Sequence, residues 1–417
     1  MKSKVVIISL FILTPLLLLE LVSLTITSFF PNSPILSQKT LLTKMSNYDS
    51  VLGTRTSGAI QNNGFVDKSI IHPYLGFVKN PNIDKNVNSD GFYRNDNSIP
   101  KRSPEKIIIG ILGGSFTTQM NRSSLNTLTD TLQKSSKFQT KKIEIIPLAI
   151  SAWKQPQQSQ ALNYFLNLGY EFDYIINLDG FNEVGISYEQ NFIYSLRPEL
   201  PVNWSYLSTN NSNPKIQKLI SNIKFSTQKI IQTNQIINTP IIQNSLIGLS
   251  TTSLIKKHFY SQVVKDNQSL LEIIDSQNSI NNTKYLDEKD FFQKQANLWA
   301  QSSIVMSKTS KANDITYFHF LQPNQYVPNS KPLSKEEQSL AYSIETNNGY
   351  FHPVTQGYPF LIEKGKYLVS QNVNFTDLTQ IFNNSHETYY SDTCCHLNKA
   401  GYDIVAQKIA ETIIQNN

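Results

Sequence analysis

The sequence predicts an α/β fold, a three-layer α/β/α sandwich with a mainly parallel sheet. Three short apolar runs rich in β-branched residues, 107–112, 142–150 and 172–178, are typical of buried central strands. Helical patterns separate these runs, and the alternation of strand, helix and strand favours a parallel sheet with right-handed crossovers. At 417 residues the chain is long enough to bury a large core in one or two domains.

The N-terminus predicts a membrane anchor. Lys2 and Lys4 precede an apolar run from residue 5 to residue 30, which is long enough to span a bilayer. Positive residues before such a run favour an N-terminus in the cytoplasm and the rest of the chain outside. We therefore expect a single-pass, uncleaved signal anchor, with a cleaved signal peptide ending near residues 25–28 as the alternative. Both place the remainder outside the cytoplasm, in the periplasm or at the cell surface.

The rest of the chain is expected to form a tether and one large domain. From residue 203 to about residue 288 the sequence is rich in Asn, Ser and Ile and has no sheet pattern. This predicts a helical insertion, either a lid or a membrane-proximal cap. The expected organisation is a transmembrane helix at 1–30, a linker at 31–48 and a main domain at 49–417 that contains the insertion.

Composition and motifs argue against several classes of function. The net charge is +6, but Lys and Arg are scattered and no basic run is longer than a pair, so no nucleic-acid partner is expected. The sequence has no Gly-x-x-x-x-Gly-Lys phosphate loop and no His-Glu-x-x-His motif, so we expect no cofactor and no metal. The two cysteines, Cys394 and Cys395, are adjacent, which is neither a disulfide framework nor a zinc-ligand pattern. Two thiols are favoured over a strained vicinal disulfide.

The first apolar strand ends in a glycine turn that is followed by a serine. Gly113 and Gly114 allow a sharp turn and a close approach of the backbone to a neighbour. A helix is expected at about 124–132, so Ser115 follows the carboxyl end of a central strand, where open α/β sheets bind their ligands. A serine at this place can be a nucleophile, or it can serve only as a helix N-cap.

Three further strands are also followed by polar residues. The second strand is followed by a loop that contains Ala152 and the polar Gln155, and the third is followed by residues 179–183. A strand expected at 315–321 is followed by Gln322. Because the carboxyl ends of parallel strands meet at one edge of a sheet, these loops together describe a crevice.

A histidine near the C-terminus completes a possible catalytic set. His396 is the one histidine of six that has an aspartate, Asp392, shortly before it and a predicted helix, 403–414, shortly after it. A lone histidine is more often structural than catalytic. Together with Ser115, the arrangement supplies a nucleophile, a base and an acidic group that orients the imidazole.

These segments resemble the sequence blocks of the SGNH, or GDSL-type, hydrolases of the membrane-anchored extracytoplasmic bacterial type. The resemblance covers residues 107–183 and 322–414 and implies the SGNH, flavodoxin-like form of the sandwich. The absence of a Gly-x-Ser-x-Gly elbow argues against the ordinary α/β-hydrolase fold. The matching blocks are, in chain order, Gly113-Gly114-Ser115, residues 149–152, Gly180-Phe181-Asn182-Glu183 and residues 392–396.

The resemblance implies a role for each matching residue. Ser115 would be the nucleophile, His396 its general base and Asp392 the group that orients the imidazole. The oxyanion hole would consist of the Ser115 N–H, the Ala152 N–H and the Asn182 side-chain amide. Substrate contacts are expected from Gly114, Gln155, Glu183 and Gln322; for Gln155 and Gln322, hydrogen bonding within the loops is an equal alternative.

Two positions depart from the family pattern. The final block usually has the spacing Asp-x-x-His, whereas Asp392 and His396 are separated by three residues. Either Asp392 still reaches the imidazole or a backbone carbonyl orients it instead. Ala152 stands where the family usually has glycine, which is harmless if only its N–H is used and its φ is negative.

The sequence therefore predicts an enzyme, a serine esterase of the SGNH type that acts on ester bonds. Its expected substrate is a small acyl ester, such as an acetyl group on a cell-surface glycan, and the reaction is either hydrolysis or acyl transfer. The alternatives are a glycan-binding or assembly protein that has the fold without turnover, and a lipid esterase with the insertion over its site.

Overall fold

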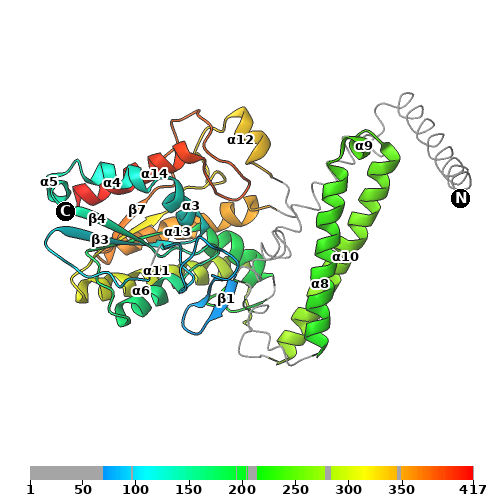
Figure 1. The fold of residues 1–417 in the computed structure, drawn as a ribbon, viewed down its shortest axis with the longest axis horizontal. Coiled ribbons are helices and arrows are strands. Elements are labelled where there is room, and N and C mark those ends of the chain that lie inside the picture. The colour runs from blue at the N-terminus through cyan, green and yellow to red at the C-terminus, as the bar shows by residue number, and fades with distance from the viewer. Residues whose placement is uncertain are drawn as a thin grey trace, which may run out of the picture. The chain divides into compact units, whose positions relative to one another are not determined.

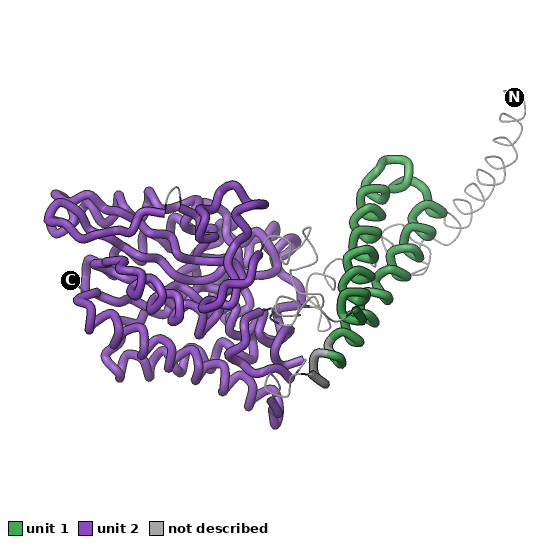
Figure 2. The backbone as a smooth tube through the Cα atoms, turned by 60° about the horizontal axis from the view of Figure 1, so that its bottom comes forward, with its two compact units in different colours: residues 1–63, 210–276 green, residues 64–209, 277–417 purple. Residues whose placement is uncertain are grey.

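The computed structural model describes residues 69–94, 97–193, 195–202, 204, 214–277, 283–344 and 349–416. The chain forms two compact units (Figure 2): residues 1–63 with 210–276, and residues 64–209 with 277–417. The predicted transmembrane helix and linker lie outside the described residues. In the described part of the chain, no helix combines the length and the apolarity needed to cross a bilayer.

The larger unit contains a five-stranded parallel sheet, as the sequence predicts. Its strands are β3 (Lys106–Gly113), β4 (Lys142–Pro147), β5 (Tyr174–Asp179), β6 (Thr316–Leu321) and β7 (Asn374–Asp377). The strand order is β4-β3-β5-β6-β7, with every neighbouring pair parallel. Numbered along the chain this order is 2-1-3-4-5, the flavodoxin-like doubly wound order. In that topology ligands bind where the order reverses, between the carboxyl ends of β3 and β5.

Helices cover both faces of this sheet (Figure 1), which confirms the three-layer architecture of the larger unit. One face carries α3 (Ser115–Ser123), α4 (Leu125–Leu132) and α14 (Lys399–Gln415), which pack on one another. The other carries α6 (Gln157–Asn167), α11 (Glu288–Ala312) and α13 (Phe351–Ser370). The unit also contains two short helices, α5 (Ser136–Gln139) and α12 (Lys335–Leu340).

The core of the larger unit follows from the sequence of its strands. Ile107, Ile108, Ile109, Ile111 and Leu112 of β3 are all buried, as expected for a central strand covered on both faces. The strand carries no alternating polar face because helices exclude water from both sides of the sheet.

A short antiparallel hairpin precedes the sheet, in a segment for which the sequence predicts irregular or short-stranded structure. It consists of β1 (Ser69–His72) and β2 (Gly76–Lys79). The indole N–H of Trp153 donates to the Phe77 carbonyl oxygen at 3.0 Å, and Phe77 is completely buried. The hairpin is thereby attached to the loop that follows β4.

The described part of the other unit is helical. It contains α8 (Pro214–Ile237), α9 (Pro240–Gln243) and α10 (Leu246–Gln277). Ile237 and Leu249 form a small buried cluster against which Ile242 packs. Within the segment for which the sequence predicts a helical insertion, the described residues 214–277 thus form these helices.

One expectation about the region after the serine turn needs correction. The sequence predicts a single helix at about 124–132, whereas the structure has α3, which begins at Ser115 itself, and then α4. The helix starts early because the backbone becomes helical directly after the glycine turn. Ser115 is therefore the first residue of α3, next to N–H groups that lack partners in the helix.

Candidate active site

The glycine turn before Ser115 is required by close backbone contacts. Gly113 has a φ of +152°, and a Cβ atom there would lie 2.2 Å from the Leu178 carbonyl oxygen. A Cβ atom on Gly114 would lie 2.3 Å from the Asn182 amide nitrogen. Any side chain at either position would collide, so the two glycines bring the end of β3 against the end of β5. Ser115 is half-buried at this junction.

The last helix of the chain brings His396 to Ser115. The Asn398 side chain caps α14 by accepting a hydrogen bond from the Gly401 N–H at 3.0 Å. Tyr402, in the first turn of α14, packs edge-to-face on Phe116, the residue after Ser115, with ring centroids 5.1 Å apart. Because α14 is fixed on α3, the loop before it reaches the start of α3.

The three residues predicted to act together form a hydrogen-bonded chain. His396 Nε2 lies 2.9 Å from Ser115 Oγ, and His396 Nδ1 lies 2.5 Å from Asp392 Oδ2. In the neutral tautomer that fits these contacts, Nδ1–H donates to the carboxylate and Nε2 accepts the serine O–H. The ring is thus oriented as a general base towards a serine oxygen.

The extra residue between Asp392 and His396 is accommodated by a tight turn around the carboxylate. Asp392 Oδ1 accepts hydrogen bonds from the N–H groups of Cys394, Cys395 and His396, at 2.9, 3.0 and 3.1 Å. These bonds draw the loop back on itself, so that the other oxygen, Oδ2, faces the imidazole. The first of the two alternatives left open by the sequence therefore describes the structure: Asp392 reaches His396 directly.

Three residues after β6 hold this loop in place through hydrogen bonds to its backbone carbonyl oxygens. Asn324 Nδ2 donates to the Cys394 carbonyl oxygen at 2.9 Å, and Gln325 Nε2 donates to the Asp392 carbonyl oxygen at 2.9 Å. Tyr326 Oη donates to the Thr393 carbonyl oxygen at 2.8 Å. Neither Gln325 nor Tyr326 is singled out by sequence reasoning, because their contacts depend on a loop about seventy residues further along the chain.

The surroundings of His396 favour its protonated form. Burial lowers its pKa, but the neighbouring Cys395 sulfur and the hydrogen bond and negative charge of Asp392 outweigh burial and raise the pKa to about 9. For Asp392, burial raises the pKa, but the hydrogen bonds and charge of His396 lower it by more, so that the net pKa is below its ordinary value. The pair therefore holds a carboxylate beside the imidazole across the neutral range.

The predicted oxyanion-hole residues lie at the same end of the sheet. Asn182 begins a π-helical turn, η1 (Asn182–Ile186), and its amide donates to the Trp153 carbonyl oxygen at 2.7 Å. A second π-helical turn, η2 (Tyr188–Phe192), follows it. A primary amide has two N–H groups, so this bond leaves Asn182 with another donor. Trp153 directly follows Ala152, so the Asn182 amide is bonded to the residue next to the other predicted donor, the Ala152 N–H.

The conformation of Ala152 contradicts one expectation. Its φ is +69°, in the left-handed region, whereas the sequence-based argument for tolerance assumes a negative φ. A residue with a Cβ atom costs roughly 1–2 kcal/mol in this conformation. Glycine adopts it freely, so the replacement of glycine by alanine at this position carries backbone strain.

Three of the residues predicted to contact the substrate have buried side chains. Gln155 and Glu183 are each 1% exposed and Gln322 is 3% exposed. The two Glu183 carboxylate oxygens accept hydrogen bonds from the N–H groups of Gln155 and Gly180, at 2.9 and 3.0 Å. Glu183 thus joins the loops after β4 and β5. Burial and the nearby Asp179 charge raise the pKa of Glu183 to about 8. Gly114 has no side chain, and a Cβ atom there would collide with the Asn182 amide.

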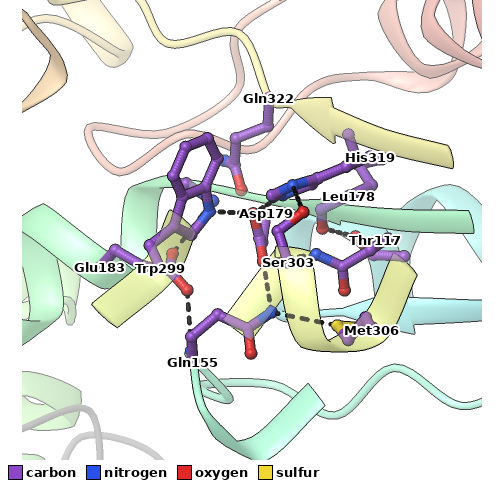
Figure 3. Close-up of polar contacts among 12 residues, drawn as sticks. Thr117, Gln155, Leu178, Asp179, Glu183, Trp299, Ser303, Met306, His319 and Gln322 are labelled. Atoms are coloured by element: carbon purple, nitrogen blue, oxygen red, sulfur yellow. Dashed lines mark hydrogen bonds and ion pairs between the residues drawn. The ribbon is translucent and has the colours of Figure 1, made fainter. Parts of the chain in front are cut away.

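A second, fully buried polar cluster lies beneath these loops (Figure 3). Asp179 Oδ1 accepts from Trp299 Nε1 at 2.7 Å and lies 2.9 Å from His319 Nε2. His319 Nδ1 is 2.8 Å from Ser303 Oγ. Asp179 Oδ2 accepts from Gln155 Nε2 at 3.3 Å, which links the cluster to the loop after β4.

The described residues therefore include two arrangements of Ser, His and Asp, and these differ in their access to solvent. Ser303 and His319 are 0% exposed and Asp179 is 2% exposed, so no substrate can reach Ser303 without local unfolding. Ser115 and His396 are both half-buried and open to solvent. The buried His319–Asp179 pair lies next to the loop that holds Asn182, where it is suited to supporting the site.

Sequence reasoning missed the buried cluster, although a signal for it exists. Asn177 is paired with His319 in the parallel register of β5 and β6, and Asp179 lies two residues further on the same face. Isolated polar residues at alternate positions in otherwise apolar strands therefore mark a shared buried polar site.

Comparisons with known proteins add the following findings. No family model matches the chain, and no curated protein matches it. Among solved structures, a GDSL-like lipase from Bacteroides thetaiotaomicron has a TM-score of 0.34 at 10% identity, over 76% of this chain and 92% of that one. A lipase from a goat rumen metagenome has a TM-score of 0.36 at 9% identity, over 74% of this chain and 97% of that one.

Proposed function

We propose that this chain is a serine esterase in which Ser115 is the nucleophile, His396 the general base and Asp392 the group that orients the imidazole. The observation that carries the proposal is the hydrogen-bonded chain from Ser115 Oγ through His396 to Asp392, with distances of 2.9 and 2.5 Å. Such a chain activates a hydroxyl that is otherwise a weak nucleophile. Its position at the reversal of strand order is where this type of sheet binds ligands.

The proposed reaction is acyl transfer in two steps. Ser115 Oγ attacks the ester carbonyl carbon while its proton passes to His396 Nε2. The imidazolium then gives that proton to the departing alcohol oxygen, which leaves an acyl group on the serine. In the second step a water or a sugar hydroxyl attacks the acyl group by the same proton route, and Ser115 is regenerated.

The negative charge that develops on the carbonyl oxygen requires fixed donors. The proposed donors are the N–H groups of Ser115 and Ala152 and the amide of Asn182. One donor of this type typically contributes about 3–4 kcal/mol to transition-state stabilisation. The network that holds Asn182 to the Trp153 carbonyl oxygen keeps the amide in place before the substrate arrives.

The direct test is hydrolysis of p-nitrophenyl acetate by residues 46–417, compared with the Ser115→Ala variant. The proposal predicts that the variant loses at least about a thousandfold in kcat/KM, because the nucleophile is removed. Hydrolysis by the wild type that is no faster than that of Ser115→Ala would contradict it.

The finer proposal concerns substrate and location. We propose that the chain acts outside the cytoplasm on small acyl groups carried by cell-surface glycans. The support is the apolar N-terminal run and a composition rich in uncharged polar residues. Acetate release from an O-acetylated polysaccharide, measured beside fatty-acid release from a triacylglycerol emulsion, tests the proposal. Faster release from the lipid would overturn it in favour of a lipid esterase.

A further inference from the structure

Two thiols and an imidazole converge beside Ser115. Cys394 Sγ and Cys395 Sγ are 3.1 Å apart, and both residues are free cysteines. One ligand atom from each of Cys394, Cys395 and His396 lies within 4.8 Å of the other two. Neither sulfur takes part in the proposed esterase chemistry.

This set of atoms matches the preferences of a soft divalent cation. Thiolate and imidazole ligands select Zn²⁺ and related metals over hard cations such as Mg²⁺. With Zn–S bonds of about 2.3 Å in a tetrahedron, two sulfur ligands stand about 3.8 Å apart. The two sulfurs therefore need to separate by only a fraction of an ångström to bind one ion.

The loop that carries these ligands is already ordered. Asp392 Oδ1 holds the N–H groups of all three ligand residues, and Asn324 holds the Cys394 carbonyl oxygen. Cys394 and His396 are half-buried while Cys395 is buried, so two of the three ligand residues are accessible to an ion from solvent. Little ordering entropy would remain to be lost on binding.

We propose that Cys394, Cys395 and His396 form a site for a soft divalent cation, of the class of Zn²⁺ or Cd²⁺, and that its occupation switches off the esterase. Both imidazole nitrogens are engaged, Nε2 with Ser115 and Nδ1 with Asp392. Whichever nitrogen binds the ion, one of these hydrogen bonds is lost, and the base no longer acts on the serine. Binding at neutral pH converts two thiols to thiolates and the protonated imidazole to its neutral form, which releases three protons with no oxidation.

The inhibition rests on the proposed esterase function, whereas metal binding does not. The experiment therefore measures metal binding and ester hydrolysis separately. The full chain, freed of metal with a chelator, is titrated with Cd²⁺, and the ultraviolet charge-transfer band of cadmium–thiolate bonds is followed together with proton release. Hydrolysis of p-nitrophenyl acetate is measured on the same samples. Mg²⁺ at equal concentration is the control, because it disfavours sulfur ligands.

We expect one Cd²⁺ per chain, a sulfur charge-transfer band and at least about a tenfold loss of hydrolysis that a chelator reverses. In Cys394→Ser, and in Cys394→Ala as a second variant, Cd²⁺ affinity should fall by more than about tenfold. Inhibition is expressed relative to the metal-free activity of each variant, and thermal unfolding establishes that each variant is folded.

Each other outcome is decisive. No charge-transfer band in the wild type, or equal Cd²⁺ affinity in a folded Cys394 variant, overturns the site. Binding with undiminished hydrolysis overturns the switch. Cadmium binding by a chain that hydrolyses no ester supports the site and instead contradicts the proposed esterase function.

Discussion

Among single residues, His396 determines the pH at which the proposed esterase works. Its pKa is raised to about 9: burial opposes the shift, and Cys395 and Asp392 outweigh burial. A general base acts only when it is unprotonated. The activity should therefore increase as the pH rises through this pKa.

We predict that kcat/KM for p-nitrophenyl acetate, measured with a chelator present, increases between pH 6 and pH 9 and levels off above the pKa of His396. In Asp392→Asn the negative charge is lost, so the increase should shift to lower pH and the plateau should fall by on the order of 10³–10⁴. A profile that is flat from pH 6 to pH 10, or unchanged in the variant, would show that this pair does not control the reaction.

A second residue-scale prediction concerns the strained backbone at Ala152. Ala152→Gly should raise the free energy of unfolding by about 0.5–1 kcal/mol, because the relief of left-handed strain exceeds the entropic cost of glycine. The control is Ala149→Gly, a buried position in the same loop without a positive φ, which should be destabilising. Urea unfolding of both variants measures the effect; destabilisation by Ala152→Gly would refute the strain.

At the scale of elements, the two arrangements of Ser, His and Asp make different predictions. Ser303→Ala removes the hydroxyl that faces His319 Nδ1 and leaves a buried acceptor without a partner. We expect a loss of about 1–3 kcal/mol in stability and little change in p-nitrophenyl acetate hydrolysis. The matched variant Ser115→Ala should do the reverse. Loss of hydrolysis in a folded Ser303→Ala variant would make the buried cluster the reaction centre.

The elements also show which features can be predicted from sequence. The strands β3, β5 and β6 are predictable because their apolar runs are bounded by turn residues. The polar residues that follow the carboxyl ends of these strands locate the candidate site. The support given by Gln325 and Tyr326 is not predictable, since it depends on a distant loop. The positive φ of Ala152 is equally hidden, because nothing in the identity of an alanine signals a left-handed backbone.

At the scale of the whole molecule, the helical segment belongs to a different compact unit from the sheet. The Thr283 N–H donates to the Ser195 carbonyl oxygen at 2.9 Å, and Tyr285 Oη donates to the Leu196 carbonyl oxygen at 2.7 Å. The two ends of the intervening segment therefore meet inside the larger unit. The sequence predicts this helical insertion from its lack of a sheet pattern, but its packing into a separate unit is a property of the folded chain.

We predict that replacing residues 205–280 by a flexible Gly/Ser linker of about ten residues, with an end-to-end distance of roughly 17 Å, leaves the α/β unit folded. The variant of residues 46–417 should unfold cooperatively within a few degrees of the parent and should still hydrolyse p-nitrophenyl acetate. Circular dichroism during heating measures the first property. A variant that aggregates or melts without cooperativity would show that the sheet depends on the helices.

The central claim is that Ser115 is an activated nucleophile. The most direct measurement is treatment of the metal-free chain with a fluorophosphonate, followed by peptide mass spectrometry. We predict one covalent adduct, on Ser115, and its loss when His396 is replaced by Gln. No adduct on Ser115, or an adduct on Ser303 instead, would contradict the claim.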